Sequence, residues 1–171
     1  MTAIRKKAIK GLKSGDTLIV RRTFTEADTK IFGDISKDYN PIHYDERYAS
    51  VKNMKGRICH GLLVGSMVTE IGGQVGWLAS RMNFHFRAPV YFGDTIECRL
   101  TITKIDSRGR AGADAVFHNQ EGIMVMEAEL EGIVPGKPEC KILDQMMREG
   151  DPTNRITDNS DDDRHKTWGR D

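Results

Sequence analysis

The sequence lacks the cysteine patterns that mark disulfide-bonded or zinc-binding domains. Its three cysteines, Cys59, Cys98 and Cys140, are odd in number and follow neither a CxxC nor a zinc-finger spacing. Isolated cysteines of this kind are typical of a reducing compartment, where disulfides rarely persist. We therefore expect three free thiols and a cytoplasmic location.

The sequence also lacks a surplus of either charge. It has 26 lysines and arginines against 25 aspartates and glutamates, so no overall field attracts nucleic acid or an anionic membrane. The basic opening MTAIRKKAIKGLKSGD has neither the apolar stretch nor the cleavage site of a secretion signal, although an organelle transit peptide stays open. We expect neither nucleic acid nor a membrane among the partners.

No long apolar run is free of polar residues. The most apolar one, GLLVGSMVTEIGGQVGWLA at residues 61–79, has about the length of a membrane span but contains Glu70, Gln74 and five glycines. A carboxylate is costly in lipid. A helix buried in a globular core, over about residues 62–80, is the better interpretation.

Alternating apolar and polar residues predict an antiparallel sheet. The segments at 17–24, 83–94 and 95–105 have this period or are rich in β-branched residues. Turn-like segments at Ser107 and Gln120 separate two further strands, about 111–119 and 123–134. The apolar face of the strand at 95–105 consists of Ile96, Cys98, Leu100 and Ile102. This is the pattern of a half-buried antiparallel strand.

Capping signals place two short helices before the long one. Thr25 and Asp28 match a capping box, and Asp45 is a good N-cap for the second helix. The first helix carries on one face Ala27, Ile31 and Ile35. Together with the strands, these helices indicate an α+β fold in a single domain, which suits the 171-residue length.

The segment KDYNPIHYDERYAS at residues 37–50 holds an unusual pair. In a continuous helix Asp38 and His43 would point about 140° apart. Pro41 makes that helix unfavourable and pushes Asn40 into an extended conformation, so the chain must turn and can bring the two side chains together. An aspartate and a histidine in one small volume are suited to moving protons or, less often, to holding a metal.

Three motifs resemble one family. The segments FGDISKDYNPIHYDERYAS at 32–50, GRICHGLLVGSM at 56–67 and FRAPVYFGDTI at 86–96 are similar to the MaoC-like (R)-specific enoyl-CoA hydratases, and the likeness covers about residues 15–134. The resemblance implies a hot-dog domain over residues 1–134, with one long helix wrapped by a curved antiparallel sheet. It also implies a homodimer formed through an exposed sheet edge.

The resemblance further implies hydration or dehydration of acyl thioesters, carried by coenzyme A or acyl carrier protein, without metal or redox cofactor. Asp38 and His43 match the pair that holds the reacting water. Gly61 matches the position whose N–H faces the thioester oxygen, at a helix start where free donors gather. Asn40 is expected to fix the turn, and Thr69 to place a hydroxyl near the substrate.

Each assignment has a structural alternative. Asp38 and His43 are also common as a turn cap and an ordinary buried histidine. Gly61 also suits a glycine needed only for close packing, and the Thr69 hydroxyl also suits a bond to the preceding helical turn. Lys55, Arg57 and Arg87 are candidates for meeting the phosphates of the carrier, or are simply solvated, as most charged loop residues are.

Other classes of function stay open. His43 and Asp45 form an H-x-D pair that, with His85 or His118, would imitate a non-haem iron site. A jelly roll of strands should then surround the pair, whereas here a long apolar helix follows it. A thioesterase or a non-catalytic acyl-thioester-binding module on the same fold is a further alternative.

The neighbouring Cys59 and His60 do not form a convincing nucleophilic pair, because adjacent residues in an extended loop point apart. Beyond Pro135 the chain is polar, with few core-forming residues. We expect residues 135–171 to form a largely flexible tail, with a helix at most around 142–148.

Overall fold

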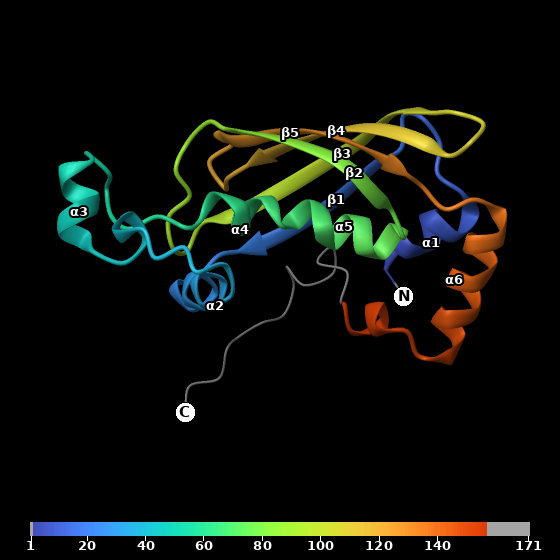
Figure 1. Ribbon diagram of the computed structural model, residues 1–171, viewed down its shortest axis with the longest axis horizontal. Helices are drawn as coiled ribbons and strands as arrows, with labels where there is room; N and C mark the ends of the chain where they lie inside the picture. Colours follow the sequence, from blue (N-terminus) through green and yellow to red (C-terminus); the bar gives the residue numbers. More distant parts are fainter. Residues whose placement is uncertain (1, 157–171) are drawn as a thin grey trace.

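The computed structural model describes residues 2–156, which form one antiparallel sheet with helices against it (Figure 1). The strands are β1 (Thr17–Thr23), β2 (Leu78–Phe86), β3 (Thr95–Ile105), β4 (Arg110–His118) and β5 (Met124–Ile133). The helices are α1 (Ala3–Lys10), α2 (Glu26–Ser36), α3 (Glu46–Val51), α4 (Gly61–Gly65), α5 (Met67–Val75) and α6 (Lys137–Glu149). Short 3-10 helices lie at η1 (Pro41–His43) and η2 (Pro152–Arg155).

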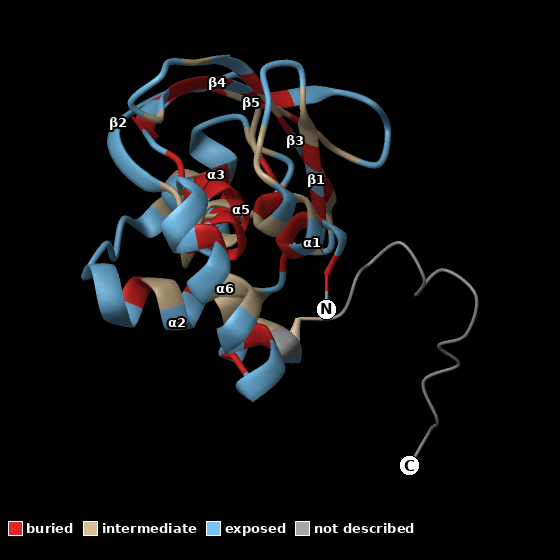
Figure 2. Ribbon diagram, turned by 90° about the vertical axis from the view of Figure 1, so that its right-hand side faces the viewer, coloured by how far each residue is buried: buried red, intermediate tan, exposed pale blue. Residues whose placement is uncertain are grey.

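The sheet has the strand order β1-β3-β4-β5-β2, and all neighbours are antiparallel. The predicted strand at 95–105 is confirmed as β3, and its predicted face is buried, with each of the four side chains at most 1% exposed. The sheet curves over α5, and buried positions gather between the two (Figure 2). The predicted α+β class and hot-dog architecture are confirmed.

The central helix is shorter than predicted and is not continuous. It is interrupted at Ser66, where the amide bonds to both Leu62 and Leu63 carbonyls, and the second part ends at Val75. Gly76 then takes the left-handed conformation, with φ at 80°, and the amides of Gly76 and Trp77 both bond to the Gly72 carbonyl. The predicted end at residue 80 is wrong, because this glycine cap stops the helix and β2 begins at Leu78.

Helix α2 begins as predicted but does not bury its apolar face. The capping box of Thr25 and Asp28 is present. However, Ile31 is 61% exposed and Ile35 is 78% exposed, and the buried residues of α2 are Thr29 and Gly33. The apolar stripe of α2 therefore lies on the surface of the single chain.

Two terminal helices pack together. Helix α1, which the sequence did not suggest, lies beside α6. A buried ion pair joins Arg5 of α1 to Asp151, the N-cap of η2 just after α6, with Nη2 and Oδ1 3.6 Å apart. The side chains of Cys140 and Met147 on α6 are also buried. The helix expected around 142–148 is found as part of α6, which is longer and begins at Lys137. The expected flexibility of the tail stays a prediction, and residues 157–171 lie outside the described part. The division at residue 134 stays a prediction.

All three cysteines are free, as expected, and all three are buried. Within residues 2–156, each helix is too short or too polar to traverse a bilayer. The apolar side chains of the segment at 61–79 that face the sheet are buried in the core, as the sequence favoured: Leu63, Val64, Met67, Val68, Ile71 and Val75.

Candidate active site

A cavity of about 660 Å³ opens beside the start of α4. One wall comes from α2, η1 and the loop before α4, and the other from β2, β5 and the loop after β2. Its apolar lining includes Phe32, Met54, Ile58, Leu62, Val64, Phe86, Val90, Val125 and Met126. Asp38, His43, His60 and Gly61 also line it, so the polar groups meet within a largely apolar space.

The Asn-Pro turn brings the predicted pair together. Asn40 caps η1, because its Oδ1 accepts from the amide of Ile42 at 3.2 Å, and Pro41 is the first residue of that 3-10 helix. The amide of Asn40 donates in turn to Oδ1 of Asp38 at 3.2 Å. Asn40 therefore fixes the turn, as expected, and is not among the residues that line the cavity.

The tautomer of His43 is set by one hydrogen bond. Its Nδ1 lies 2.8 Å from the carbonyl of Ile58, which only accepts, so Nδ1 carries the proton and Nε2 is the bare nitrogen. Burial lowers the pKa of His43 from its usual 6.5, and nearby His60 adds to this effect against the opposing influence of the Ile58 carbonyl and Asp38. His43 is thus neutral at pH 7 and offers Nε2 as a base.

His60 belongs to this group, although sequence reasoning considered it only as a partner of Cys59. It is 1% exposed, and its Nε2 donates to the carbonyl oxygen of Asp38 at 2.8 Å. Its ring lies against the His43 ring, with centroids 3.9 Å apart and planes 31° apart. The one available signal was its place directly before Gly61.

Cys59 itself is not a nucleophile. Burial raises the pKa of its thiol to about 12, so the reactive thiolate is almost absent at neutral pH.

Gly61 is the first residue of α4 and lines the cavity. The first amides of a helix have no acceptor within it, so a donor is available here. A Cβ at this position would lie 2.5 Å from Cε1 of Phe86 on β2. Close packing against Phe86 therefore requires glycine, and this requirement is compatible with a donor role.

Thr69 is not brought to this cavity. It is exposed on α5, and its hydroxyl donates to the Ser66 carbonyl at 2.6 Å. The structure thus shows the alternative in which the hydroxyl bonds to the preceding helical turn.

The proposed iron ligands are not assembled. Asp45 caps α3 and pairs with Arg47, while His85 lies on exposed β2 beside Glu127. Within residues 2–156, the group of His, Cys, Asp and Glu close enough to hold an ion is Asp38, His43 and His60, whose ligand atoms lie within 4.8 Å of one another.

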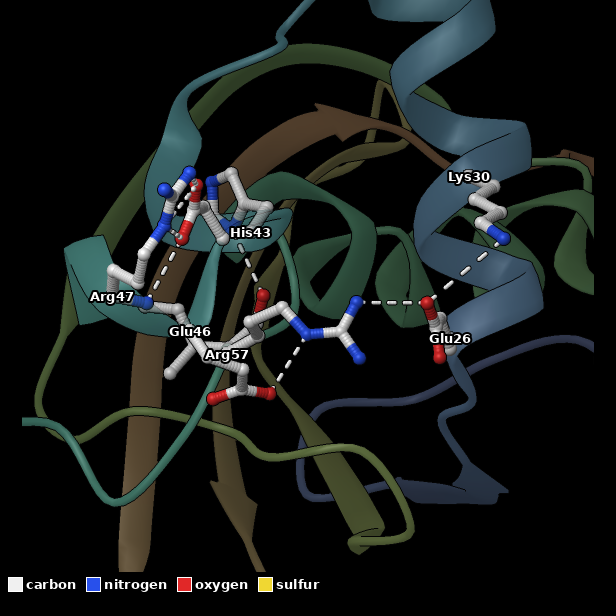
Figure 3. A network of polar contacts seen from close by, with 8 residues as sticks. Glu26, Lys30, His43, Glu46, Arg47 and Arg57 are labelled. Carbon is white, nitrogen blue, oxygen red and sulfur yellow. Dashed lines mark hydrogen bonds and ion pairs between the residues drawn. The ribbon is translucent and has the colours of Figure 1, made fainter. Parts of the chain in front are cut away.

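Arg57 holds the helices beside the cavity in place (Figure 3). Its guanidinium donates to Glu26 of α2 at 2.8 Å and to Glu46 of α3 at 2.9 Å, and it lies over the ring of Phe92. Two carboxylates therefore already occupy Arg57. Of the three basic residues considered for carrier phosphates, Arg87 lines the cavity.

The chain folds as a hot-dog sheet around a helix. A cavity at the start of that helix is lined by an aspartate and a histidine. This combination defines a class of protein, and comparisons with known proteins identify the same class. Residues 14–121 match the MaoC like domain, and the chain belongs to that family. The mitochondrial 3-hydroxyacyl-[acyl-carrier-protein] dehydratase of Arabidopsis thaliana is 32% identical over 133 residues, covering 72% of this chain and 78% of the relative.

Two further relatives agree. An (R)-specific enoyl-CoA hydratase of Rhodospirillum rubrum is 28% identical, over 74% of this chain and 90% of its own. The unliganded R-hydratase structure from Pseudomonas aeruginosa has a TM-score of 0.68 and 27% identity, covering 74% of this chain and 84% of its own. The predicted family is therefore confirmed.

Proposed function

We propose that the protein is a hydro-lyase that reversibly hydrates trans-2-enoyl thioesters to (R)-3-hydroxyacyl thioesters. The observation that carries the proposal is the convergence of Asp38 with the bare Nε2 of His43 on an apolar cavity. The relatives support the reaction class, because they are named as hydratases and dehydratases of acyl thioesters.

In the proposed reaction, Asp38 and His43 hold one water between them. His43 Nε2 takes a proton from this water as its oxygen bonds to the β-carbon of the conjugated thioester. The electron pair of the double bond passes to the α-carbon, which receives on the same face the proton that His43 took from the water, so His43 is neutral again at the end of the step. The reverse sequence eliminates water.

Gly61 completes the proposed mechanism. As the electrons move, negative charge develops on the thioester oxygen, and the free N–H at the start of α4 is suited to stabilise it. No metal or redox step is part of the proposal. The carrier is coenzyme A or acyl carrier protein. One relative is named for acyl carrier protein and another for coenzyme A.

We also propose that a second copy of the chain covers β2. This edge strand is exposed along eight of its nine residues, including Leu78, Met82 and Phe86. An unpaired edge with apolar side chains is a liability that pairing with another copy removes.

The test is to follow the loss of conjugated-thioester absorbance with enoyl-CoA substrates of several chain lengths. Asp38→Asn and His43→Gln should each lower the hydration rate by about two to four orders of magnitude. Asp114→Asn and His118→Gln, which make the same changes on β4 away from the cavity lining, should not. Release of free coenzyme A, measured on the same samples, would instead indicate a thioesterase.

Product chirality and non-additivity test the pair independently. Syn addition on one face should give the (R) product, and the double variant should lose far less than the product of the two single losses. An (S) product, or folded variants with near-normal rates, would show that the catalytic groups lie elsewhere.

A further inference from the structure

His60 packs against two rings that belong to different elements. Its centroid lies 3.9 Å from that of His43 on η1 and 5.1 Å from that of Phe32 on α2. The ring is 1% exposed. A buried side chain packed against two rings in this way has little freedom to rotate, so it is a rigid reference for the His43 ring beside it.

The same ring also holds the main chain at Asp38. Its Nε2–H donates to the Asp38 carbonyl at 2.8 Å, across 22 residues of sequence. This bond fixes the start of the turn whose other end carries His43. His60 is also joined by one peptide bond to Gly61. Three parts of the site therefore meet at one imidazole: the Asp38 main chain, the His43 ring and the start of α4.

We propose that His60 is a positioning residue, which holds Asp38, His43 and the first amide of α4 in one fixed arrangement. This inference rests on the hydration function proposed above, since it assigns His60 a role within that site. His60 acts through its neighbours: its N–H is used on a backbone carbonyl, and its ring face rests on the base.

One feature of the ring is unexplained by packing alone. The Nδ1 of His60 is buried without a hydrogen-bond partner among the described residues. A metal ligand would have such a bare nitrogen, with the other nitrogen donating to a carbonyl. The ligand atoms of Asp38, His43 and His60 lie within 4.8 Å of one another, so metal binding is an alternative that the experiment must separate.

Two variants divide the role of His60 into its parts. His60→Phe keeps a ring of similar size but removes the N–H, whereas His60→Gln keeps a donor and removes the ring. We expect kcat to fall about ten- to a hundredfold in His60→Phe with KM little changed, as for loss of a bond that orients a reacting group. His60→Gln should recover part of the loss.

The matched comparison repeats His60→Phe in a protein that already carries His43→Gln and so lacks the proposed base. If His60 acts through His43, then His60→Phe should cost less than about threefold in a His43→Gln protein. An equal loss in both backgrounds would overturn the claim that His60 positions His43, because it would mean that His60 acts only on the Asp38 main chain and the start of α4.

Titration of His43 by NMR gives a readout that needs no substrate. The groups that face His43 are Asp38, which raises its pKa, His60, which lowers it, and the edge of Tyr44. Removal of His60 should therefore move the His43 titration to higher pH. An unmoved titration in a folded His60→Phe protein would overturn the proposal.

Failure of the positioning role of His60 and failure of the proposed hydration function give different results. If no enoyl thioester is hydrated while the His43 titration moves, the reaction is wrong and the contact of His60 with His43 is supported. If purified protein retains stoichiometric zinc that both His60 variants lose, His60 is a metal ligand and the positioning role is overturned.

Discussion

Gly61→Ala tests how closely α4 must approach β2. The new Cβ would lie 2.5, 2.9 and 3.0 Å from three carbons of the Phe86 ring, where ordinary contact begins at 3.4 Å. Phe86 is 57% exposed, so its ring can swing outward. The cost should be about 1 kcal/mol if only the ring moves, and about 3 kcal/mol if the start of α4 is displaced. For a chain of this size this lowers the Tm by roughly 2–12 °C.

The effect on catalysis follows from the same displacement. If α4 shifts by about 1 Å, the Gly61 amide is misplaced and kcat should fall up to about a hundredfold. Phe86→Ala in the same chain removes the collision, so the double variant should regain most of the loss in both stability and kcat. Gly65→Ala is the control: its Cβ would lie 3.2 Å from Phe84, and the better helix propensity of alanine offsets this milder contact.

Thermal unfolding and steady-state hydration should be measured on the wild type, Gly61→Ala, the double variant with Phe86→Ala, and Gly65→Ala. Unchanged Tm and kcat in Gly61→Ala would refute the close approach at this position. A Gly61→Ala defect that Phe86→Ala does not relieve would show that the collision lies elsewhere, and a Gly65→Ala defect of equal size would show that α4 tolerates no added methyl group at all.

Three further predictions concern other parts of the molecule. Burial lowers the pKa of His43 below its unfolded value of 6.5. The free energy of unfolding should therefore be undiminished above pH 6.5 and fall as the pH drops through the folded-state pKa. Urea unfolding measured against pH should show a smaller fall for His43→Gln than for the wild type. Asp151→Leu leaves the buried Arg5 without its ion-pair partner and should cost about 3–5 kcal/mol in urea unfolding. The double variant Arg5→Met with Asp151→Leu should be about as stable as the wild type. Equal losses in the single and double variants would contradict a buried pair. Met82→Glu on β2 should shift a dimer toward monomer in sedimentation; a purely monomeric wild type at micromolar concentration would contradict the proposed pairing.

Signals between neighbouring residues predicted much of the fold. The capping box of Thr25 and Asp28, the alternation along 95–105 and the turn at Asn40 each depend on residues close in sequence, and each is found in the structure. The predicted meeting of Asp38 and His43 at one cavity follows from that turn. These features are local, so one sequence carries enough information to place them.

Other features depend on distant contacts that no local pattern contains. Arg5 and Asp151 are 146 residues apart, and α6 buries just two side chains, so its pattern resembled a solvated tail. The apolar stripe of α2 correctly indicated a helix but not whether a single chain covers it. His60 gained its place in the site from Asp38, 22 residues earlier, and not from its neighbour Cys59.

The buried thiol of Cys59 has a chemical consequence for a cavity proposed to bind thioesters. A thiolate beside a thioester accepts its acyl group, which would leave the protein blocked by its own substrate. Cys59 lines the cavity, yet burial raises the pKa of its thiol to about 12, so very little thiolate forms at pH 7. The apolar surroundings that suit an acyl chain thus also protect the protein from acylating itself, and alkylating reagents should leave this sulfur untouched while the fold is intact.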